Sequence, residues 1–313
     1  YAYHAQIHGA ILAYLEIKKK NFYSIVSDVD GKRFVTARGW EDLSVVMKVY
    51  EQQGLPINYD FVVQYLQDPE IARDFAVYYE LYQKYNQIYR IPELLEGEFP
   101  EDVLAIQNAP FDEKLSLIGL LLDALSQEFV TYARWENAQK EFLAQLGYLR
   151  IDLKEGKGSA KELLERQSES HETMTAHRKK ANLLSREELR TAHDLQKAFD
   201  ACVRLVTEAG SGDARSDFGL VKQYFDEQEN LRQTQIADTG RHLSNAFDFL
   251  SRVFGEGQEL VIFLSELSAG YYSLKFVSEC GNEDYYKYNR LLLLKDRGEE
   301  LTQEVMQILA LDD

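Results

Sequence analysis

Hydrophobic positions recur at intervals of three and four residues along almost the whole chain, which is the period of an amphipathic α-helix. The clearest example follows Pro69, where aromatic side chains form a row: Phe75, Tyr78, Tyr82, Tyr85 and Tyr89. Their spacings of 3, 4, 3 and 4 are typical of a helix-packing stripe, which we favour over a platform for a ligand. The pattern therefore predicts a mostly all-α protein.

One short stretch interrupts the helical period. Residues 22–35 contain two apolar segments separated by Asp30-Gly31, a pair that favours the tight turn of a β-hairpin. Helices are expected over residues 7–19 before the hairpin and up to about Gln53 after it. A further helix is expected from Asn58 to Leu66.

Helix breakers gather between residues 91 and 110, which include Pro92, Gly97, Pro100 and Pro110. We expect a linker with short helical turns there. The predicted organisation has four parts, listed here in chain order: a helical subdomain with a hairpin (1–90), the linker (91–110), a long-helix bundle or antiparallel coiled-coil arm (111–254), and a helical segment that packs back on the bundle or on the first subdomain (255–313).

The arm is predicted from long helices with apolar ends. The helix expected from about 214 to 254 has a polar middle between Gln228 and Gly240, so its ends are expected to pack in a core and its shaft to lie in solvent. Ser185 and Glu188 form a capping box before another helix. A final helix is expected over about 299–310.

The net charge and the residue composition exclude several classes of binding partner. The 313 residues carry a net charge of −17, which repels nucleic-acid backbones and anionic membranes. Two cysteines are too few for a disulfide framework, and no apolar run reaches the length of a membrane span. We therefore expect a cytoplasmic protein that binds neither nucleic acid nor membrane.

The most informative stretch surrounds Arg38. Thr36 is the expected N-cap of a helix, which puts Arg38 at its second position, although the helix dipole favours anions at that end. An external phosphate could complete such a site. Alternatively, Glu41 and Asp42 neutralise the arginine and leave only a charged helix start. The residues alone leave both interpretations open.

Thr36-Ala-Arg38, followed by Trp40 and Leu43, resembles the sensor-2 helix in the lid of AAA+ ATPases of the MoxR-like branch, with Ala37 where that family often has proline. The resemblance covers roughly residues 4–90 and extends to the order of helix, hairpin and helices. It implies a chaperone-like remodelling or assembly ATPase in which Arg38 contacts the γ-phosphate of ATP. ATP and Mg would then be held by an AAA+ core outside this chain.

The same resemblance implies two further features of such systems, a hexameric ring and a von Willebrand A-type partner protein. The chain opens without Met, directly into an expected helix, so we expect it to be the C-terminal part of a longer protein. In that protein the helical arm would bind a client or adaptor.

A second candidate site lies in the block that starts at Gly255-Glu-Gly-Gln-Glu259, which resembles the tail of clostridial-type MoxR-like ATPases. Glu266 lies between Leu264 and Leu267, so burial would raise its pKa unless it is paired. It could accept an Arg or Lys from residues 1–90 and dock the tail there, or it could be an ordinary exposed glutamate.

Several other sites are not supported by the sequence. Gly156-Lys-Gly-Ser159 lacks the spacing of a phosphate-binding loop, so this chain alone is not expected to hydrolyse ATP, and no catalytic residue is assigned. Metal binding is not expected either, and the histidines are taken as surface residues: His171 and His177 cannot share a helix face, while His4 and His8 lie at the terminus. Cys202 is expected to be a buried thiol.

Two rival functions remain. One is a free-standing helical scaffold or adaptor without nucleotide binding. The other is a helical hydrolase with scattered acids, among them Glu259 and Glu266, which would require convergent carboxylates with shifted pKa values in a pocket.

Overall fold

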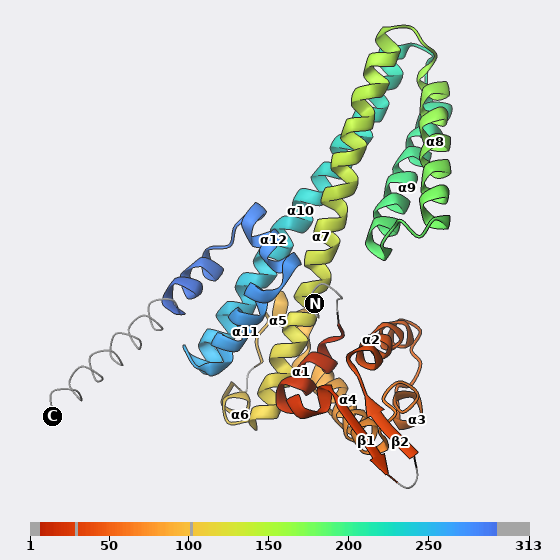
Figure 1. The fold of residues 1–313 in the computed structure, drawn as a ribbon. Helices are drawn as coiled ribbons and strands as arrows, with labels where there is room; N and C mark the ends of the chain where they lie inside the picture. The colour runs from red at the N-terminus through yellow and green to blue at the C-terminus, as the bar shows by residue number, and fades with distance from the viewer. Residues whose placement is uncertain (1–6, 29–30, 101–102, 293–313) are drawn as a thin grey trace, which may run out of the picture. The chain divides into compact units, whose positions relative to one another are not determined.

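The computed structural model describes residues 7–28, 31–100 and 103–292. Over these residues the protein is mostly α-helical with one two-stranded sheet, as predicted (Figure 1). The elements are α1 (Gly9–Ile17), η1 (Lys19–Phe22), β1 (Ser24–Asp28), β2 (Gly31–Val35), α2 (Ala37–Gln52), α3 (Tyr59–Val62), α4 (Pro69–Tyr89), α5 (Ile91–Leu95), α6 (Val103–Gln107), α7 (Phe111–Lys154), α8 (Ala160–Lys180), α9 (Arg186–Ala209), α10 (Ala214–Phe254), α11 (Gln258–Ala269) and α12 (Tyr271–Cys280). Residues 283–292 are also helical.

Most predicted helices are present with small differences at their ends. The helix expected from Asn58 to Leu66 is shorter, because α3 ends at Val62 and turns follow it. Asp30 of the hairpin turn, His4 and the helix expected over 299–310 lie outside the described residues.

The chain divides into two compact units. The first takes in the chain up to Gln127 and again from Thr239, and the second contains residues 128–238. These boundaries fall inside α7 and α10, and they differ from the four segments expected from the sequence, 1–90, 91–110, 111–254 and 255–313. One reason is that the first turns of α7 pack with α4: the Tyr78 hydroxyl lies 2.9 Å from Ser116 Oγ.

The N-terminal part of the first unit has an aromatic core. β1 and β2 pair antiparallel, with Ser24 opposite Val35 at the open end. Trp40 of α2 is 2% exposed, and its ring centroid lies 5.7 Å from that of Tyr14 and 5.2 Å from that of Phe75. Burial of these large rings joins α1, α2 and α4.

The aromatic row of α4 is a packing stripe, as predicted. Phe75, Tyr82 and Tyr89 are buried, and Tyr78 and Tyr85 are partly buried. The phenol of Tyr82 is fully enclosed and has no hydrogen-bond partner among the described residues. The row therefore serves the core of the first unit.

The segment expected as a linker does contain short helices, α5 and α6, but α5 is packed. Ile91, Leu94 and Leu95 are buried. The Asn245 side-chain amide of α10 donates to the Leu95 carbonyl oxygen at 2.7 Å. This part of the chain is thus fixed against α10.

Helix α11 packs on α7 and α10, within the first unit. The rings of Phe263 and Phe247 have centroids 5.2 Å apart, and Lys114 Nζ lies 3.1 Å from Glu259 Oε1. The sequence left open whether this segment packs on the bundle or on residues 1–90, and the contacts place it on the long helices.

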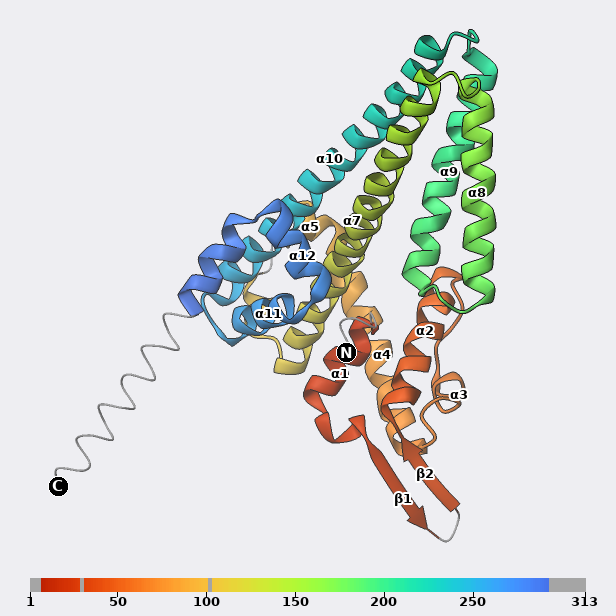
Figure 2. The same ribbon diagram turned by 45° about the horizontal axis from the view of Figure 1, so that its top comes forward.

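The second unit contains α8 and α9 side by side with parts of α7 and α10 (Figures 1 and 2). Both α8 and α9 begin with capping boxes, Ser159 with Glu162 and Ser185 with Glu188, and the second was predicted. The core includes Phe142, Leu149, Leu164, Phe199 and Val221. Four helices thus contribute to one hydrophobic core.

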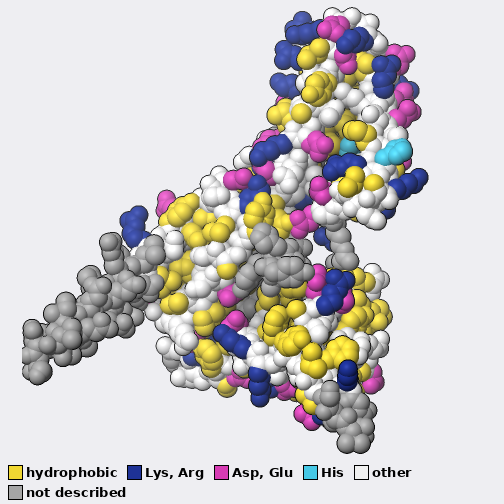
Figure 3. All heavy atoms as spheres, in the orientation of Figure 1, with side chains coloured by type: hydrophobic (Ala, Val, Ile, Leu, Met, Phe, Trp, Pro, Cys, Tyr) yellow, Lys and Arg dark blue, Asp and Glu magenta, His cyan; other side chains and the backbone are white. Residues whose placement is uncertain are grey.

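Helix α7 contains a window with mean hydropathy 1.2, which is apolar enough for a membrane span by composition. Half of that window is buried inside the protein, which is typical of a core helix. Among the described residues, α11 and α12 pass the same test only as a pair bent by 87°. Figure 3 shows acidic and basic side chains scattered among hydrophobic ones over the face in view.

Candidate functional site

The start of α2 has the geometry expected around Arg38. Thr36 is the N-cap in extended conformation, and its Oγ1 accepts a hydrogen bond from the Gly39 amide at 3.2 Å. The Arg38 side chain is 75% exposed. Its Nε donates to Asp42 Oδ2 at 3.1 Å, and a guanidinium nitrogen lies 3.8 Å from Glu41 Oε2. The local ion pairs considered from the sequence are therefore present.

These ion pairs do not close the site to an anion. Exposed pairs at this helical spacing contribute only about 0.3–0.5 kcal/mol each. A phosphate that accepts charge-assisted hydrogen bonds from Arg38 could compete with them. The geometry is compatible with both interpretations of Arg38.

The helix that carries Arg38 is firmly held. The Trp40 indole N–H donates to the Asn21 carbonyl oxygen at 3.2 Å, and Leu43 and Met47 are buried. A Cβ atom at Gly39 would lie 2.7 Å from the Tyr65 carbonyl oxygen, so only glycine fits this contact. The close approach of Gly39 was not predicted, because its partner lies 26 positions further along the chain.

His8 belongs to a buried polar cluster, and the expectation that it is a surface residue is wrong. It is 2% exposed, its Nδ1 accepts from the Ala10 amide at 3.1 Å, and its Nε2 lies 2.9 Å from Glu51 Oε2. Glu51 also accepts from the Tyr79 hydroxyl at 2.7 Å. Burial would raise the pKa of Glu51, but the hydrogen bonds from His8 and Tyr79 outweigh it and hold the pKa below its usual value. The cluster joins α1, α2 and α4.

The described residues contain no group of three potential metal ligands. His171 is hydrogen bonded to Gln196 Oε1 at 2.9 Å, and His177 is exposed. Cys202 is fully buried, as predicted, and burial raises the pKa of its thiol to about 12. The Gly156–Ser159 turn joins two helices, and its Lys157 pairs with Asp152 at 2.8 Å.

The two glutamates of α11 have different surroundings. Glu259 pairs with Lys114 at the start of α7, and both side chains are under one-fifth exposed, at 13% and 17%. The Glu266 carboxyl forms no hydrogen bond or ion pair within the described part of the chain, and burial raises its pKa. Of the two roles left open for Glu266, docking to an Arg or Lys of residues 1–90 is not seen among the described residues.

A cavity of about 80 Å³ lies in the second unit between α7, α9 and α10. Aromatic rings of Trp135, Phe142 and Tyr224 line it, together with Leu195. Two small side chains, Ala138 and Ala198, also face it. The sequence analysis did not find this cavity, because it forms only where Ala138 of α7 and Ala198 of α9 come together in the fold.

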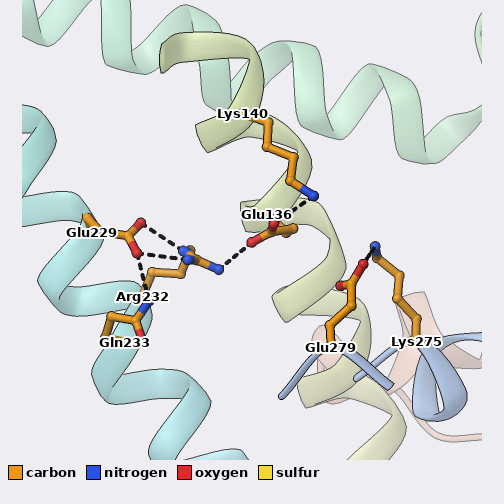
Figure 4. A network of polar contacts seen from close by, with 7 residues as sticks. All are labelled: Glu136, Lys140, Glu229, Arg232, Gln233, Lys275 and Glu279. Atoms are coloured by element: carbon orange, nitrogen blue, oxygen red, sulfur yellow. Dashed lines mark hydrogen bonds and ion pairs between the residues drawn. The ribbon is translucent and has the colours of Figure 1, made fainter. Parts of the chain in front are cut away.

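Charged side chains beside the cavity are paired with one another. Arg134 Nε lies 2.8 Å from Asp194 Oδ2, which joins α7 to α9. Arg232 of α10 donates to Glu229 at 2.7 Å and contacts Glu136 of α7 (Figure 4).

Lys140 completes this network at 2.8 Å from Glu136. The polar middle of α10 is thus bound to α7 by the ion pair between Arg232 and Glu136. The side chains of Arg232 and Glu136 are only 14% and 13% exposed.

No protein-family model matches the chain, and no curated protein or solved structure matches it.

Proposed function

We propose that this chain is the C-terminal part of a MoxR-like AAA+ ATPase, in which Arg38 senses the γ-phosphate of ATP. A core outside this chain would hold ATP with Mg and perform the hydrolysis. The observation that carries the proposal is the exposed Arg38 on a Thr36-capped helix that Trp40 and Gly39 hold in place. An arginine fixed to a rigid helix but open to solvent can report the presence of a phosphate.

The long helices would carry the second half of the function. Helix α2, which carries Arg38, packs on the aromatic core of the first unit through Trp40, and α7 and α10 both continue from that unit into the second. A change at Arg38 could therefore be passed on to a client or adaptor bound by the second unit, which would act as an antiparallel coiled-coil arm. A hexameric ring, a von Willebrand A-type partner and a cytoplasmic location belong to this proposal by resemblance.

Steady-state ATP turnover tests the first half in a longer protein that also carries the core. Arg38→Ala is expected to lower turnover at least about tenfold, which corresponds to one strong charge-assisted interaction with the transferred phosphate. Asp42→Asn, which removes a local competitor for Arg38, is expected to keep or raise turnover. Lys84→Ala on the exposed face of α4 is the matched control. Unchanged turnover in Arg38→Ala would sink the proposal.

A helical scaffold without nucleotide binding is the second candidate. The ion pairs of Arg38 with Glu41 and Asp42 favour it, because they give the arginine a role without phosphate. Under this alternative Arg38→Ala leaves turnover unchanged and costs only about 0.5 kcal/mol of stability. The hydrolase alternative has less support, since Lys114 already neutralises Glu259.

A further inference from the structure

We infer that the cavity of the second unit is an anchor site for one aliphatic side chain, of about leucine size, on a partner's peptide segment. This inference deepens the partner-binding half of the proposed function and rests on that half alone. It requires neither ATP nor Arg38.

The walls and the size of the cavity select the chemistry of the anchor. Trp135, Phe142 and Leu195 offer apolar surface, which favours an apolar group. A cavity of about 150 Å³ is known to hold benzene. At about 80 Å³ this one is smaller, and a single branched aliphatic group matches it in size.

The charges beside the cavity argue against an ionic ligand. Asp194, which lines it, already lies 2.8 Å from Arg134 Nε and 3.8 Å from Lys197 Nζ. Glu136 follows the lining residue Trp135 in the sequence, and Arg232 lies one helical turn after the lining residue Gln228. Glu136 and Arg232 are paired with each other (Figure 4). A charged ligand would have to displace one of these partners, whereas a neutral side chain leaves them intact.

Two amide side chains line the cavity from opposite helices and favour a peptide over a free hydrocarbon. Gln139 belongs to α7 and Gln228 to α10. Neither side-chain amide forms a hydrogen bond within the described part of the chain. Each offers both a donor and an acceptor, which is the combination that a peptide backbone needs. A segment that inserts one side chain could thus bond its backbone to both glutamines.

The alternative is a simple packing defect between three helices. Such a hollow would have no selectivity for a side chain bearing a peptide backbone. Measuring binding rather than stability separates the two, because filling the hollow could stabilise the fold in either case.

Indole signals in a two-dimensional ¹H–¹⁵N NMR spectrum provide the readout. The chain has two tryptophans: Trp135 lines the cavity, and Trp40 is buried in the first unit with its indole N–H bonded to Asn21. N-acetyl-leucine methylamide is the probe, and N-acetyl-glycine methylamide is its control. We expect the leucine probe to shift the indole N–H signal of Trp135 saturably, with a dissociation constant on the order of 1–10 mM. The indole N–H signal of Trp40 should not shift.

Two variants of α7 make the test specific. Ala138→Leu fills the cavity and is expected to weaken binding of the leucine probe at least about tenfold. Ala144→Leu, an identical change at an exposed position of the same helix, is expected to bind like the unmodified chain. If circular dichroism shows that Ala138→Leu does not fold, Ala198→Leu replaces it from the α9 side.

The inference is overturned if Trp135 shows no saturable shift, if the glycine probe gives the same shift, or if the filled variant binds like the unmodified chain. The nucleotide half of the proposed function is tested separately by turnover in Arg38→Ala. Failure of the leucine probe to bind would therefore contradict only the anchor site, and unchanged ATP turnover in Arg38→Ala would contradict only the nucleotide half of the proposed function.

Discussion

Arg232→Ala probes the ion-pair network that binds α10 to α7 in the second unit. The guanidinium donates to Glu229 at 2.9 and 2.7 Å and also contacts Glu136. Removing one member of a well-buried ion pair typically costs 3–5 kcal/mol, because the other charge remains buried without compensation.

The expected cost here is smaller than that range. Glu136 keeps a second cation, Lys140, at 2.8 Å, and the Glu229 side chain is 31% exposed and can be solvated. We therefore expect Arg232→Ala to lower the free energy of unfolding of the second unit by about 2 kcal/mol. Arg178→Ala is the matched control in the second unit. Its pair with Glu188 is exposed, with side-chain exposures of 55% and 52%, so we expect a loss of about 0.5 kcal/mol or less.

Urea-induced unfolding followed by circular dichroism measures both variants, since urea, unlike guanidinium, does not screen charges. The hydrogen bond from Arg232 holds the pKa of Glu229 below its usual value despite partial burial. A group with a lowered folded-state pKa stabilises the protein above its unfolded pKa of about 4.3, and this contribution is lost as pH falls through the folded-state value.

The difference between Arg232→Ala and the unmodified chain should therefore shrink below about pH 4. Equal losses for the two arginine variants, or a difference that does not change with pH, would show that the Arg232 ion pairs do not stabilise the second unit.

Two further substitutions test the packing and capping. Gly39→Ala would put a Cβ 2.7 Å from the Tyr65 carbonyl oxygen and is expected to destabilise the first unit by about 1–3 kcal/mol in thermal unfolding. Gly147→Ala on α7, where a Cβ meets nothing within 4 Å, should instead stabilise by about 0.5–1 kcal/mol. Ser185→Ala removes the N-cap of α9 and should cost about 1 kcal/mol in urea unfolding, whereas no loss would contradict the capping-box assignment.

Local patterns predicted the elements well. The helical period, the caps at Thr36 and Ser185 and the aromatic row of α4 depend on residues within one or two turns, so the sequence displays them directly. The buried thiol of Cys202 was predictable for the same reason, since it continues an apolar heptad.

Long-range contacts were not predictable from the same patterns. His8 is buried because its ring is hydrogen bonded to Glu51 and packs on the ring of Tyr79, which lie over 40 and over 70 positions further along the chain. The polar middle of α10 suggested a shaft in solvent, yet Arg232 finds Glu136 on α7, 96 positions away. The cavity depends on which alanines of α7 and α9 meet, and no single helix shows that.

If Arg38 contacts the γ-phosphate, its loss should affect the affinity for ATP and not that for ADP. In the longer protein with its core, isothermal titration calorimetry would measure the dissociation constants of ADP and of a non-hydrolysable ATP analogue with Arg38 intact and in Arg38→Ala. We expect Arg38→Ala to weaken binding of the ATP analogue at least about tenfold and to change ADP affinity less than about twofold, since only the ATP analogue carries a γ-phosphate. Equal effects on both nucleotides, or no effect on either, would contradict the contact between Arg38 and the γ-phosphate.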